Sequence, residues 1–300
     1  MRESLHEYFQ IGTLQWMSYP DLEAADAVRK IASDDYFDAV EISPIPKARR
    51  SEVKKLLEQS HLRVSYGAHC AQLQAGWNPN SLAEEERQYA RDQLLLCIDE
   101  AAWLGAGTLS FLAGKWDTGK QEEHLQQLVK TTEELCRYAE QKGMYIELEV
   151  FDYDVDKCAL IGPAALAAEF AAAVRRDCQN FGLIVDLSHI PLTHESTEHV
   201  VHVLRPYITH FHIGNAVLYR ESPAYGDQHP RFGYPAGQND EAEVAAFLRI
   251  LQTEGFLDKR LRLPLSFEVK PRKEESADII LCNCKRTLNS AWRRLNGDWG

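Results

Sequence analysis

The stretch LIVDLSHIPL, residues 183–192, constrains the fold more than any other part of the sequence. It begins with apolar, mostly β-branched residues of the kind that fill a buried strand. The apolar run is interrupted by the carboxylate of Asp186, and the imidazole of His189 follows three residues later. Asp186 is therefore either a cap where the chain leaves a strand or part of a site at the mouth of a sheet.

Short β-rich runs recur along the whole chain of 300 residues, and segments with helical periodicity separate them. The expected strands span residues 9–14, 38–43, 62–69, 107–112, 144–150, 182–187, 208–213 and 263–269. The clearest helical segments span residues 46–60, 81–106, 120–143, 162–180, 239–255 and 275–295. Strands that alternate with helices predict a parallel sheet. Eight such units without a linker predict one α/β domain over residues 1–300, a closed (β/α)₈ TIM barrel whose C-terminal helix closes the barrel.

The main alternative fold is an open, doubly wound sheet. That fold usually carries a glycine-rich phosphate loop after its first strand, and the stretch IGTLQWMSYP, residues 11–20, has no such pattern.

Two helix starts carry capping signals. Ser81 and Glu84 predict a capping box, and Asn239 predicts the N-cap of a later helix.

The overall composition limits the cellular compartments and the kinds of partner that we expect. Hydrophobic residues make up 45% and charged residues 26%, which is typical of a globular protein in water. No apolar run is long enough to cross a bilayer, and the N-terminus has no hydrophobic signal core, so we expect a cytoplasmic protein without a membrane partner. The net charge of −12 counts against nucleic acid as a partner. The seven cysteines lack CxxC spacing and indicate reduced thiols.

Side chains alternate between the two faces of a strand, and this places polar groups on the inner face of the late strands. In THFHI, residues 209–213, Thr209 and the apolar positions face the helices, which leaves His210 and His212 facing the barrel axis. The same alternation turns Glu147 inward, one layer below the strand tips. Near the tips, four successive strands each present an inward acid or imidazole, namely Glu149, Asp186, His212 and Glu268.

Unpaired carboxylates are costly to bury, and a divalent cation removes that cost by supplying positive charge. Three carboxylates and one imidazole form a mostly oxygen site that suits Mn²⁺, Zn²⁺ or Mg²⁺. Taken singly, each residue has a structural explanation as a cap, a hydrogen-bonded core histidine or a partner of arginine. Four such residues at the tips of four consecutive strands favour one metal site. Glu147 and His210 then form a supporting or buried pair.

The spans IELEVFD, LIVDLSH, THFHIGN and LSFEVKP resemble the xylose isomerase-like TIM barrels, the superfamily of sugar isomerases and epimerases that also contains endonuclease IV. The resemblance covers essentially the whole chain. It implies that Glu149, Asp186, His212 and Glu268 bind one divalent metal, with Mn²⁺ the first expectation. It also implies that Glu149 and Glu268 carry out acid–base catalysis and that His189 binds a substrate oxygen.

In the endonuclease branch, the histidine that matches His189 binds an additional zinc ion. Asp227 and His229, in YGDQHPRFG, resemble the other ligands of that ion, and His69 also matches a ligand of the endonuclease cluster. The fourth strand departs from this pattern because it ends in Phe111 and Leu112, where the endonucleases have a histidine. A second metal held by His189, Asp227 and His229 therefore stays open.

The resemblance implies a metal-dependent isomerase or epimerase that acts on a sugar, sugar acid or related polyol through an enediolate. The candidate substrate-binding residues are His189, His69, Arg231, Lys270 and Trp116. The alternatives are cleavage of DNA at abasic sites, a lyase or dehydratase that uses the same enolisation, and a barrel that binds a partner without catalysis. The expected partner is a small carbohydrate, and the sequence leaves homo-oligomerisation open.

Overall fold

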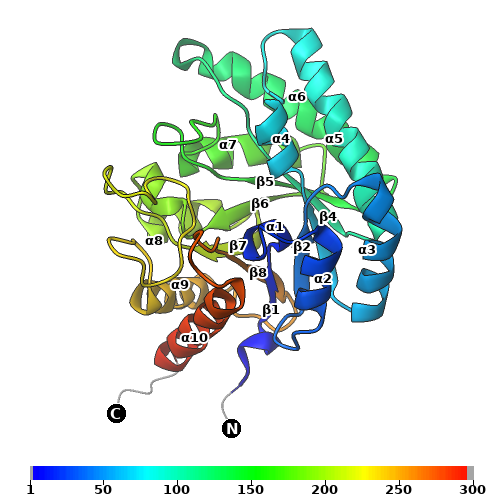
Figure 1. Cartoon of the computed structure of the whole chain (residues 1–300). Coiled ribbons are helices and arrows are strands. Elements are labelled where there is room, and N and C mark those ends of the chain that lie inside the picture. The colour runs from blue at the N-terminus through cyan, green and yellow to red at the C-terminus, as the bar shows by residue number, and fades with distance from the viewer. Residues whose placement is uncertain (1–2, 296–300) are drawn as a thin grey trace.

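The computed structural model describes residues 3–295, which form one parallel sheet of eight strands surrounded by helices (Figure 1). The strands are β1 Phe9–Thr13, β2 Ala39–Ile42, β3 Arg63–Gly67, β4 Thr108–Leu112, β5 Tyr145–Glu149, β6 Phe181–Asp186, β7 Ile208–Gly214 and β8 Leu263–Glu268. The hydrogen-bonded order is β1-β8-β7-β6-β5-β4-β3-β2. Between β1 and β2, the Asp38 N–H donates to the Ile11 carbonyl at 2.7 Å, and Leu14 bridges to Glu41. The strands therefore form a nearly closed barrel, and the predicted (β/α)₈ fold is confirmed.

The longer helices form the outer ring of the barrel (Figure 1). They are α2 Ala24–Ala32, α3 Lys47–Ser60, α5 Glu84–Leu104, α6 Gln121–Glu140, α7 Ala164–Arg175, α8 Thr197–Leu204, α9 Glu241–Thr253 and α10 Ala277–Leu295. Two short helices, α1 Gln15–Ser18 and α4 His69–Ala75, directly follow β1 and β3 and lie at the mouth of the barrel. Short 3-10 turns lie at Leu5–Glu7, Thr118–Lys120 and Ile190–Thr193. Within residues 3–295, none of the helices has the length and hydropathy that a membrane span requires.

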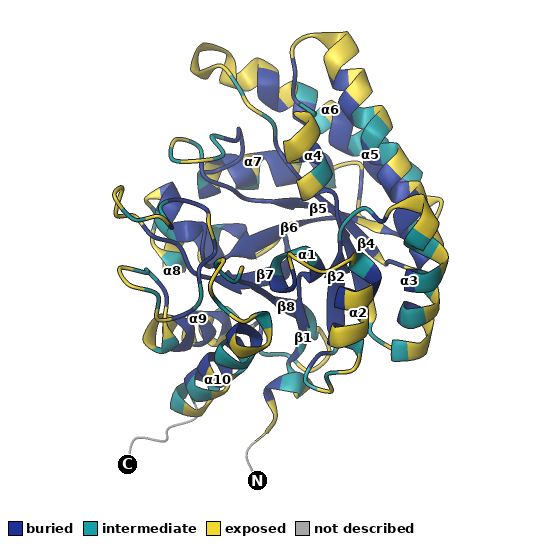
Figure 2. Cartoon of the chain, viewed as in Figure 1, coloured by how far each residue is buried: buried dark blue, intermediate teal, exposed yellow. Residues whose placement is uncertain are grey.

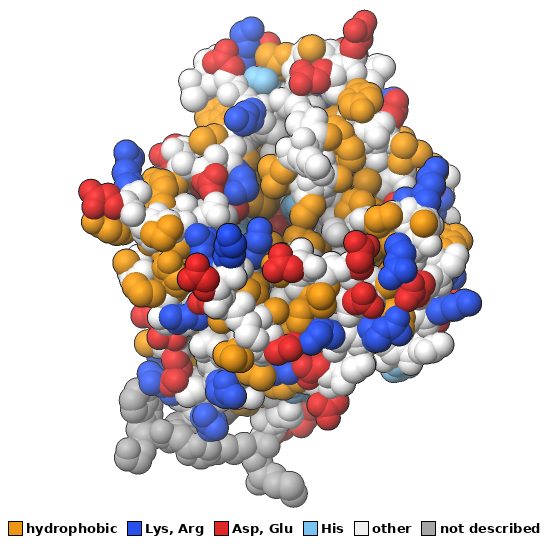
Figure 3. Space-filling view, in the orientation of Figure 1, with side chains coloured by type: hydrophobic (Ala, Val, Ile, Leu, Met, Phe, Trp, Pro, Cys, Tyr) orange, Lys and Arg blue, Asp and Glu red, His pale blue; other side chains and the backbone are white. Residues whose placement is uncertain are grey.

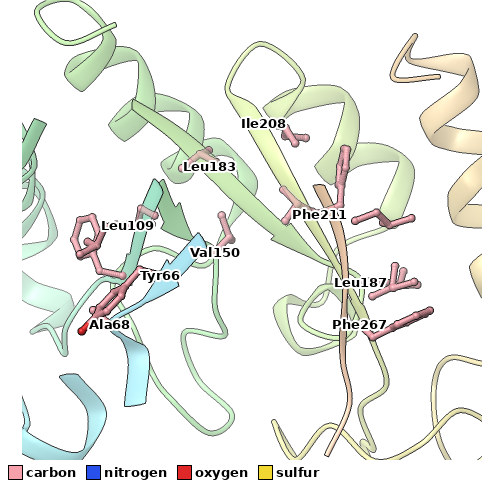
Figure 4. Packing of buried hydrophobic residues seen from close by; sticks show 14 of the residues in the cluster. Tyr66, Ala68, Leu109, Val150, Leu183, Leu187, Ile208, Phe211 and Phe267 are labelled. Carbon is pink, nitrogen blue, oxygen red and sulfur yellow. The ribbon is translucent and has the colours of Figure 1, made fainter. Parts of the chain in front are cut away.

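The barrel sheet is buried on both faces, as a parallel sheet between helices and a filled interior requires (Figure 2). Leu183, Val185 and Leu187 belong to the core cluster that packs the outer face of the sheet, and Figure 4 shows Leu183 and Leu187 within it. The carboxylate of Asp186, between them in the sequence, instead meets the inward groups of the neighbouring strands. The alternation expected for LIVDL therefore holds. It leaves the inner face of the late strands to polar groups.

One residue breaks the alternation in β7. The pairing of β6 with β7 shifts between Leu183, which faces Ile208, and Ile184, which faces His210, so Thr209 is an extra residue in the ladder. Its hydroxyl donates to Glu147 Oε1 at 2.8 Å, so the expectation that Thr209 faces the helices is wrong. Gly182 makes room for this bulge, because a Cβ there would lie 2.1 Å from the Thr209 hydroxyl oxygen.

Both predicted helix caps are wrong, by two residues for α5 and by one residue for α9. Helix α5 begins at Glu84 after the N-cap residue Ala83, and the hydroxyl of Ser81 instead accepts the Ala83 N–H and donates to Glu86. Helix α9 is capped by Asp240 in a capping box with Glu243. Asn239 is not free to cap because its amide donates to the carbonyls at the ends of β6 and β7.

Candidate metal centre

Four ligand atoms converge at the C-terminal tips of β5 to β8. They belong to Glu149, Asp186, His212 and Glu268, all of them buried, and they lie within 4.8 Å of one another. His212 Nδ1 lies 3.1 Å from Glu149 Oε1 and 2.7 Å from Glu268 Oε2. The convergence follows from parallel strands that end at one edge, each with an inward residue at its tip.

The donor set fits a divalent cation. Glu268 Oε2 has no hydrogen-bond partner despite its short distance to His212 Nδ1, so the two atoms lie side by side without hydrogen-bond geometry. Three buried carboxylates around one point repel each other unless positive charge lies between them. Together with one imidazole they offer the oxygen-rich, mixed donor set that Mn²⁺, Mg²⁺ and Zn²⁺ accept.

The outer side of His212 is held by Glu41, a residue of β2 that the sequence interpretation missed. His212 Nε2 lies 3.1 Å from Glu41 Oε1, so the ring that presents Nδ1 to the cluster donates its other N–H to a buried carboxylate. Burial alone would raise the pKa of Glu41, but the positive charges of His212 and His210 hold that pKa well below its usual range. Period-two alternation between Val40 and Ile42 is the signal that would have identified Glu41.

A second polar layer lies deeper in the barrel. His210 Nδ1 lies 3.4 Å from Glu147 Oε2, and His210 Nε2 lies 3.1 Å from Glu41 Oε1. Burial lowers the pKa of His210, but the charges of Glu41 and Glu147 outweigh burial and raise it. This layer connects the two histidines of β7 through one shared carboxylate.

Asp186 both caps the strand end and belongs to the cluster. Its Oδ1 accepts the Ser188 N–H at 2.8 Å, and its Oδ2 accepts the Ser188 hydroxyl. Burial raises the pKa of Asp186, and the negative charge of Glu268 adds to that rise. The two interpretations of Asp186 are therefore compatible, because a turn on one side of the carboxylate leaves the other side facing the cluster.

A second group of ligands adjoins the first. Asp186, His189 and His229 bring ligand atoms within 4.8 Å of one another, and Asp227 Oδ1 lies 3.0 Å from His189 Nε2 and 2.6 Å from His229 Nε2. His189 Nδ1 lies 2.9 Å from the Val150 carbonyl and must donate to it, which leaves Nε2 facing Asp227. Burial lowers the pKa of His229, but Asp227 and Glu268 raise it to about 9.

Lys157 is the cation of this second group, and nothing in the sequence marked it. Its Nζ lies 2.8 Å from Asp227 Oδ2. Burial lowers the pKa of Lys157, but the charges of Asp227 and Asp156 raise it above its ordinary value. The loop that carries Lys157 is fixed by the buried carboxylate of Asp152, which accepts the backbone N–H groups of Val155, Asp156 and Lys157 at 2.7–2.8 Å.

A pocket of about 430 Å³ opens above these groups at the centre of the face shown in Figure 3. Its walls are formed by Trp16, Met17, Pro20, His69, Cys70, Leu73, Phe151, Lys157, Asp227, Gln228, His229, Glu268 and Lys270. Glu268 therefore borders the pocket directly. Glu149 lies one residue deeper than the pocket wall, next to His69, whose Nε2 lies 3.1 Å from Glu149 Oε2.

The structure brings only some of the expected substrate-binding residues to this pocket. His69 and Lys270 border it, whereas His189 is buried behind Phe151 with 4.3 Å between ring centroids. Arg231 donates to Glu275 at 3.0 Å, and Trp116 packs against the hydrophobic core, so neither side chain lines the pocket.

Trp16, at the start of α1, is the indole that borders the pocket, and the sequence interpretation did not select it. Gly67 leaves space for its ring, because a Cβ at Gly67 would lie 2.5 Å from the Trp16 ring atom Cη2. A tryptophan just after the first barrel strand was the available signal. The neighbouring helical segment was too short to recognise from periodicity.

Comparison with known proteins supports this fold. The family model described as xylose isomerase-like TIM barrel matches residues 28–281. A D-tagatose 3-epimerase-like protein is 19% identical, with a TM-score of 0.72 and coverage of 96% of this chain and 98% of that one. The 3-keto-D-glucoside 4-epimerase of E. coli is 17% identical, with a TM-score of 0.69 and coverage of 94% and 99%. An AP endonuclease, family 2, from Brucella melitensis is 16% identical, with a TM-score of 0.67 and coverage of 91% and 96%. No curated protein matches the sequence.

Proposed function

The chain belongs to the xylose isomerase-like TIM barrel family, and from this premise we propose that it isomerises or epimerises a sugar, sugar acid or related polyol with one bound divalent cation. The observation that carries the proposal is the convergence of Glu149, Asp186, His212 and Glu268 beside a pocket of about 430 Å³. That volume lies within the range of small-molecule sites. The epimerases among the structural neighbours support the reaction class.

The chemistry follows from two carboxylates on one cluster. When bound, the cation supplies Lewis-acid polarisation of a substrate carbonyl. Glu268, which borders the pocket with an unpaired Oε2, accepts the proton from the carbon next to that carbonyl. Glu149 returns a proton to the opposite face of the same carbon, which gives the epimer. If the proton instead goes to the former carbonyl carbon, and the hydroxyl proton of the first carbon passes to the other oxygen, the product is the isomer. Each carboxylate is therefore the base in one direction and the acid in the other.

The remaining pocket residues orient the substrate. His69 borders the pocket, and its Nε2 lies 3.1 Å from Glu149 Oε2 without a hydrogen-bond partner, so this ring is placed to hydrogen-bond a substrate hydroxyl beside that carboxylate. Trp16 offers an apolar face for the carbon side of the sugar. Lys270 and Lys157 border the same pocket and compensate the negative charge that develops on the substrate oxygen.

We assign one cation to the centre, because Lys157 already neutralises the second group. Asp227 Oδ2 is paired with the Lys157 ammonium at 2.8 Å, and Asp227 Oδ1 is shared by His189 and His229. A fixed positive charge at this position repels another cation and fills one of the carboxylate sites it would need. His229 borders the pocket with both ring nitrogens engaged, Nε2 by Asp227 at 2.6 Å and Nδ1 by the Glu268 carbonyl at 3.1 Å.

Metal analysis tests the assignment of one cation. Elemental analysis of protein loaded with Mn²⁺ and desalted is expected to give one equivalent per chain for the wild type. Lys157→Met removes the ammonium and is expected to admit a second equivalent. Lys270→Met, a matched control at the same pocket, is expected to stay at one. Two equivalents in the wild type, or one in Lys157→Met, would contradict the role of Lys157.

Exchange of carbon-bound hydrogen tests the reaction class without knowledge of the product. Ketopentoses and ketohexoses incubated with the Mn²⁺-loaded enzyme in D₂O are expected to gain deuterium next to the carbonyl, detected by NMR. Glu268→Gln and Glu149→Gln are expected to slow this exchange by about 10²–10⁴-fold. Wild-type rates in both variants would overturn the proposed acid–base roles.

Cleavage of abasic DNA ranks below this proposal. The net charge is −12, and β4 ends in Phe111 and Leu112 without a histidine. An abasic duplex included in the same experiment distinguishes the two. Metal-dependent nicking without exchange into any sugar would reverse the ranking. A lyase begins with the same proton removal and would reveal itself by loss of water from the substrate.

A further inference from the structure

The outer face of α5 carries a row of exposed hydrophobic side chains that the barrel does not use. Tyr89, Leu96 and Trp103 are 58%, 60% and 46% exposed. They lie seven residues apart, a spacing that keeps them on nearly one line along a helix. The row spans ~21 Å at 1.5 Å per residue. We call these three residues the α5 stripe.

We propose that the α5 stripe is the contact between two copies of this chain, related by a twofold axis near Leu96 with the two α5 helices antiparallel. An apolar row with heptad spacing is the pattern by which helices pair along their length. A single set of residues also suits a symmetric dimer, in which the same patch serves both subunits. This inference is independent of the proposed function, because α5 lies in the outer ring between α3 and α6 (Figure 1).

The charges beside the stripe favour the antiparallel orientation. Glu84, Glu85 and Glu86 form the first turn of α5. At the other end Lys54 of α3 lies over the Trp103 ring, 5.3 Å from its centroid, and donates to the Trp103 carbonyl at 2.8 Å. Antiparallel pairing places this acidic turn of one helix beside Lys54 of the other chain, which also pairs with Glu58 of its own helix at 3.1 Å, and it opposes the helix dipoles favourably. Parallel pairing would place acid against acid.

A pocket beside the stripe accommodates the partner's aromatic side chain. It has a volume of about 400 Å³ and is bordered by Leu96 and Trp103 together with Trp77 and Arg50. In an antiparallel pair centred on Leu96, Tyr89 of the partner subunit lies opposite Trp103 and at the mouth of this pocket. An aromatic anchor in a pocket is the arrangement that concentrates binding energy in protein interfaces.

The size of the contact sets the expected strength. The 21 residues of α5 extend ~30 Å, and a helix is ~10 Å wide, so the helix alone offers a footprint of ~300 Å². A standard interface buries ~800 Å² per partner, so α3 must contribute as well. We therefore expect a dimer that dissociates in the micromolar range.

Light scattering coupled to size-exclusion chromatography tests the dimer, with loading concentrations from about 1 to about 100 µM. The wild type is expected to approach twice the 34.2 kDa chain mass as concentration rises. Leu96→Glu places two like charges at the axis and is expected to weaken the dimer at least a hundredfold. Ile279→Glu, an equally exposed apolar position on α10, is the matched control and is expected to leave it unchanged.

Charge reversal tests the orientation. Glu85→Lys is expected to weaken the dimer, and adding Lys54→Glu in the same chain is expected to restore it. Circular dichroism checks that each variant is folded. A wild type that stays monomeric at every concentration, or a dimer that withstands both Leu96→Glu and Tyr89→Ser, would overturn the proposal. A dimer lost in Leu96→Glu but strengthened by Glu85→Lys would overturn the antiparallel orientation.

Discussion

Replacing Glu41 by glutamine tests whether the inner layers of the barrel support the metal centre. Glu41 is buried, and its Oε1 lies 3.1 Å from both His212 Nε2 and His210 Nε2. Glutamine has the same shape, and its amide oxygen still accepts the His212 N–H. The substitution therefore removes the charge behind the ring while it keeps the ring in place.

The magnitude follows from what that charge does. A carboxylate that accepts the outer N–H of a metal-ligating histidine makes the ring a stronger donor, and its loss costs about 10–100-fold in metal affinity. This corresponds to about 1.4–2.7 kcal/mol. Glu147→Gln is the matched control, because Glu147 is equally buried and contacts His210 but not His212. For Glu147→Gln we expect less than about a threefold change in metal affinity.

The assay is competition between the protein and a fluorescent chelator for Mn²⁺ at pH 7.5. Thermal unfolding of the metal-free proteins checks that both variants fold. Unchanged affinity in Glu41→Gln would refute the role given to Glu41. Equal weakening in Glu41→Gln and Glu147→Gln would show that the loss comes from general disturbance of the barrel interior.

Two further predictions concern pH and the pocket wall. The pKa of His229 rises from 6.5 in the unfolded chain to about 9 in the folded metal-free protein. Protonated His229 therefore stabilises the folded state by up to about 3 kcal/mol. This contribution is fully present below pH 6.5 and is lost as the pH rises through about 9. Urea unfolding of the metal-free protein is expected to show that decline. Mn²⁺ affinity is expected to rise with pH, because the metal competes with protons on His212, whose pKa is also raised. A metal affinity independent of pH would count against imidazole ligation. Gly67→Ala forces the Trp16 ring to move and is expected to lower the free energy of unfolding by about 1–3 kcal/mol. Gly107→Ala, whose added Cβ would meet nothing within 4 Å, is expected to be neutral. Equal effects of the two substitutions in thermal unfolding would contradict the close approach of Gly67 to Trp16.

Alternation along strands predicted the part of the site that regular backbone fixes. Glu149, Asp186, His212 and Glu268 lie at strand tips, where the period of two decides the direction of a side chain and the barrel decides the meeting point. The same rule would have placed Glu41. It failed at Thr209, because a bulge inserts one residue into β7, and a bulge carries no sequence signal of its own here.

The pocket wall was harder to predict because loops build it. The carboxylate of Asp152 accepts backbone N–H groups of the loop that carries Lys157, and this turn brings Lys157 to Asp227. The geometry of such a turn depends on contacts with residues far along the chain. Arg231 and Trp116 were candidates because of their side-chain chemistry and their place after strands. Arg231 instead donates to Glu275, and Trp116 packs against the hydrophobic core, so both side chains lie away from the pocket. Residue type identifies candidates in loops, whereas tertiary contacts decide which of them reach the site.

The most direct test of the central claim is a diffraction experiment on crystals grown with Mn²⁺, with data collected to reveal the anomalous signal of the metal. We expect one strong peak per chain at about 2.0–2.3 Å from a ligand atom of each of Glu149, Asp186, His212 and Glu268. No peak at this cluster would contradict the claim. So would a second peak of equal strength among Asp186, His189 and His229, next to the ammonium of Lys157.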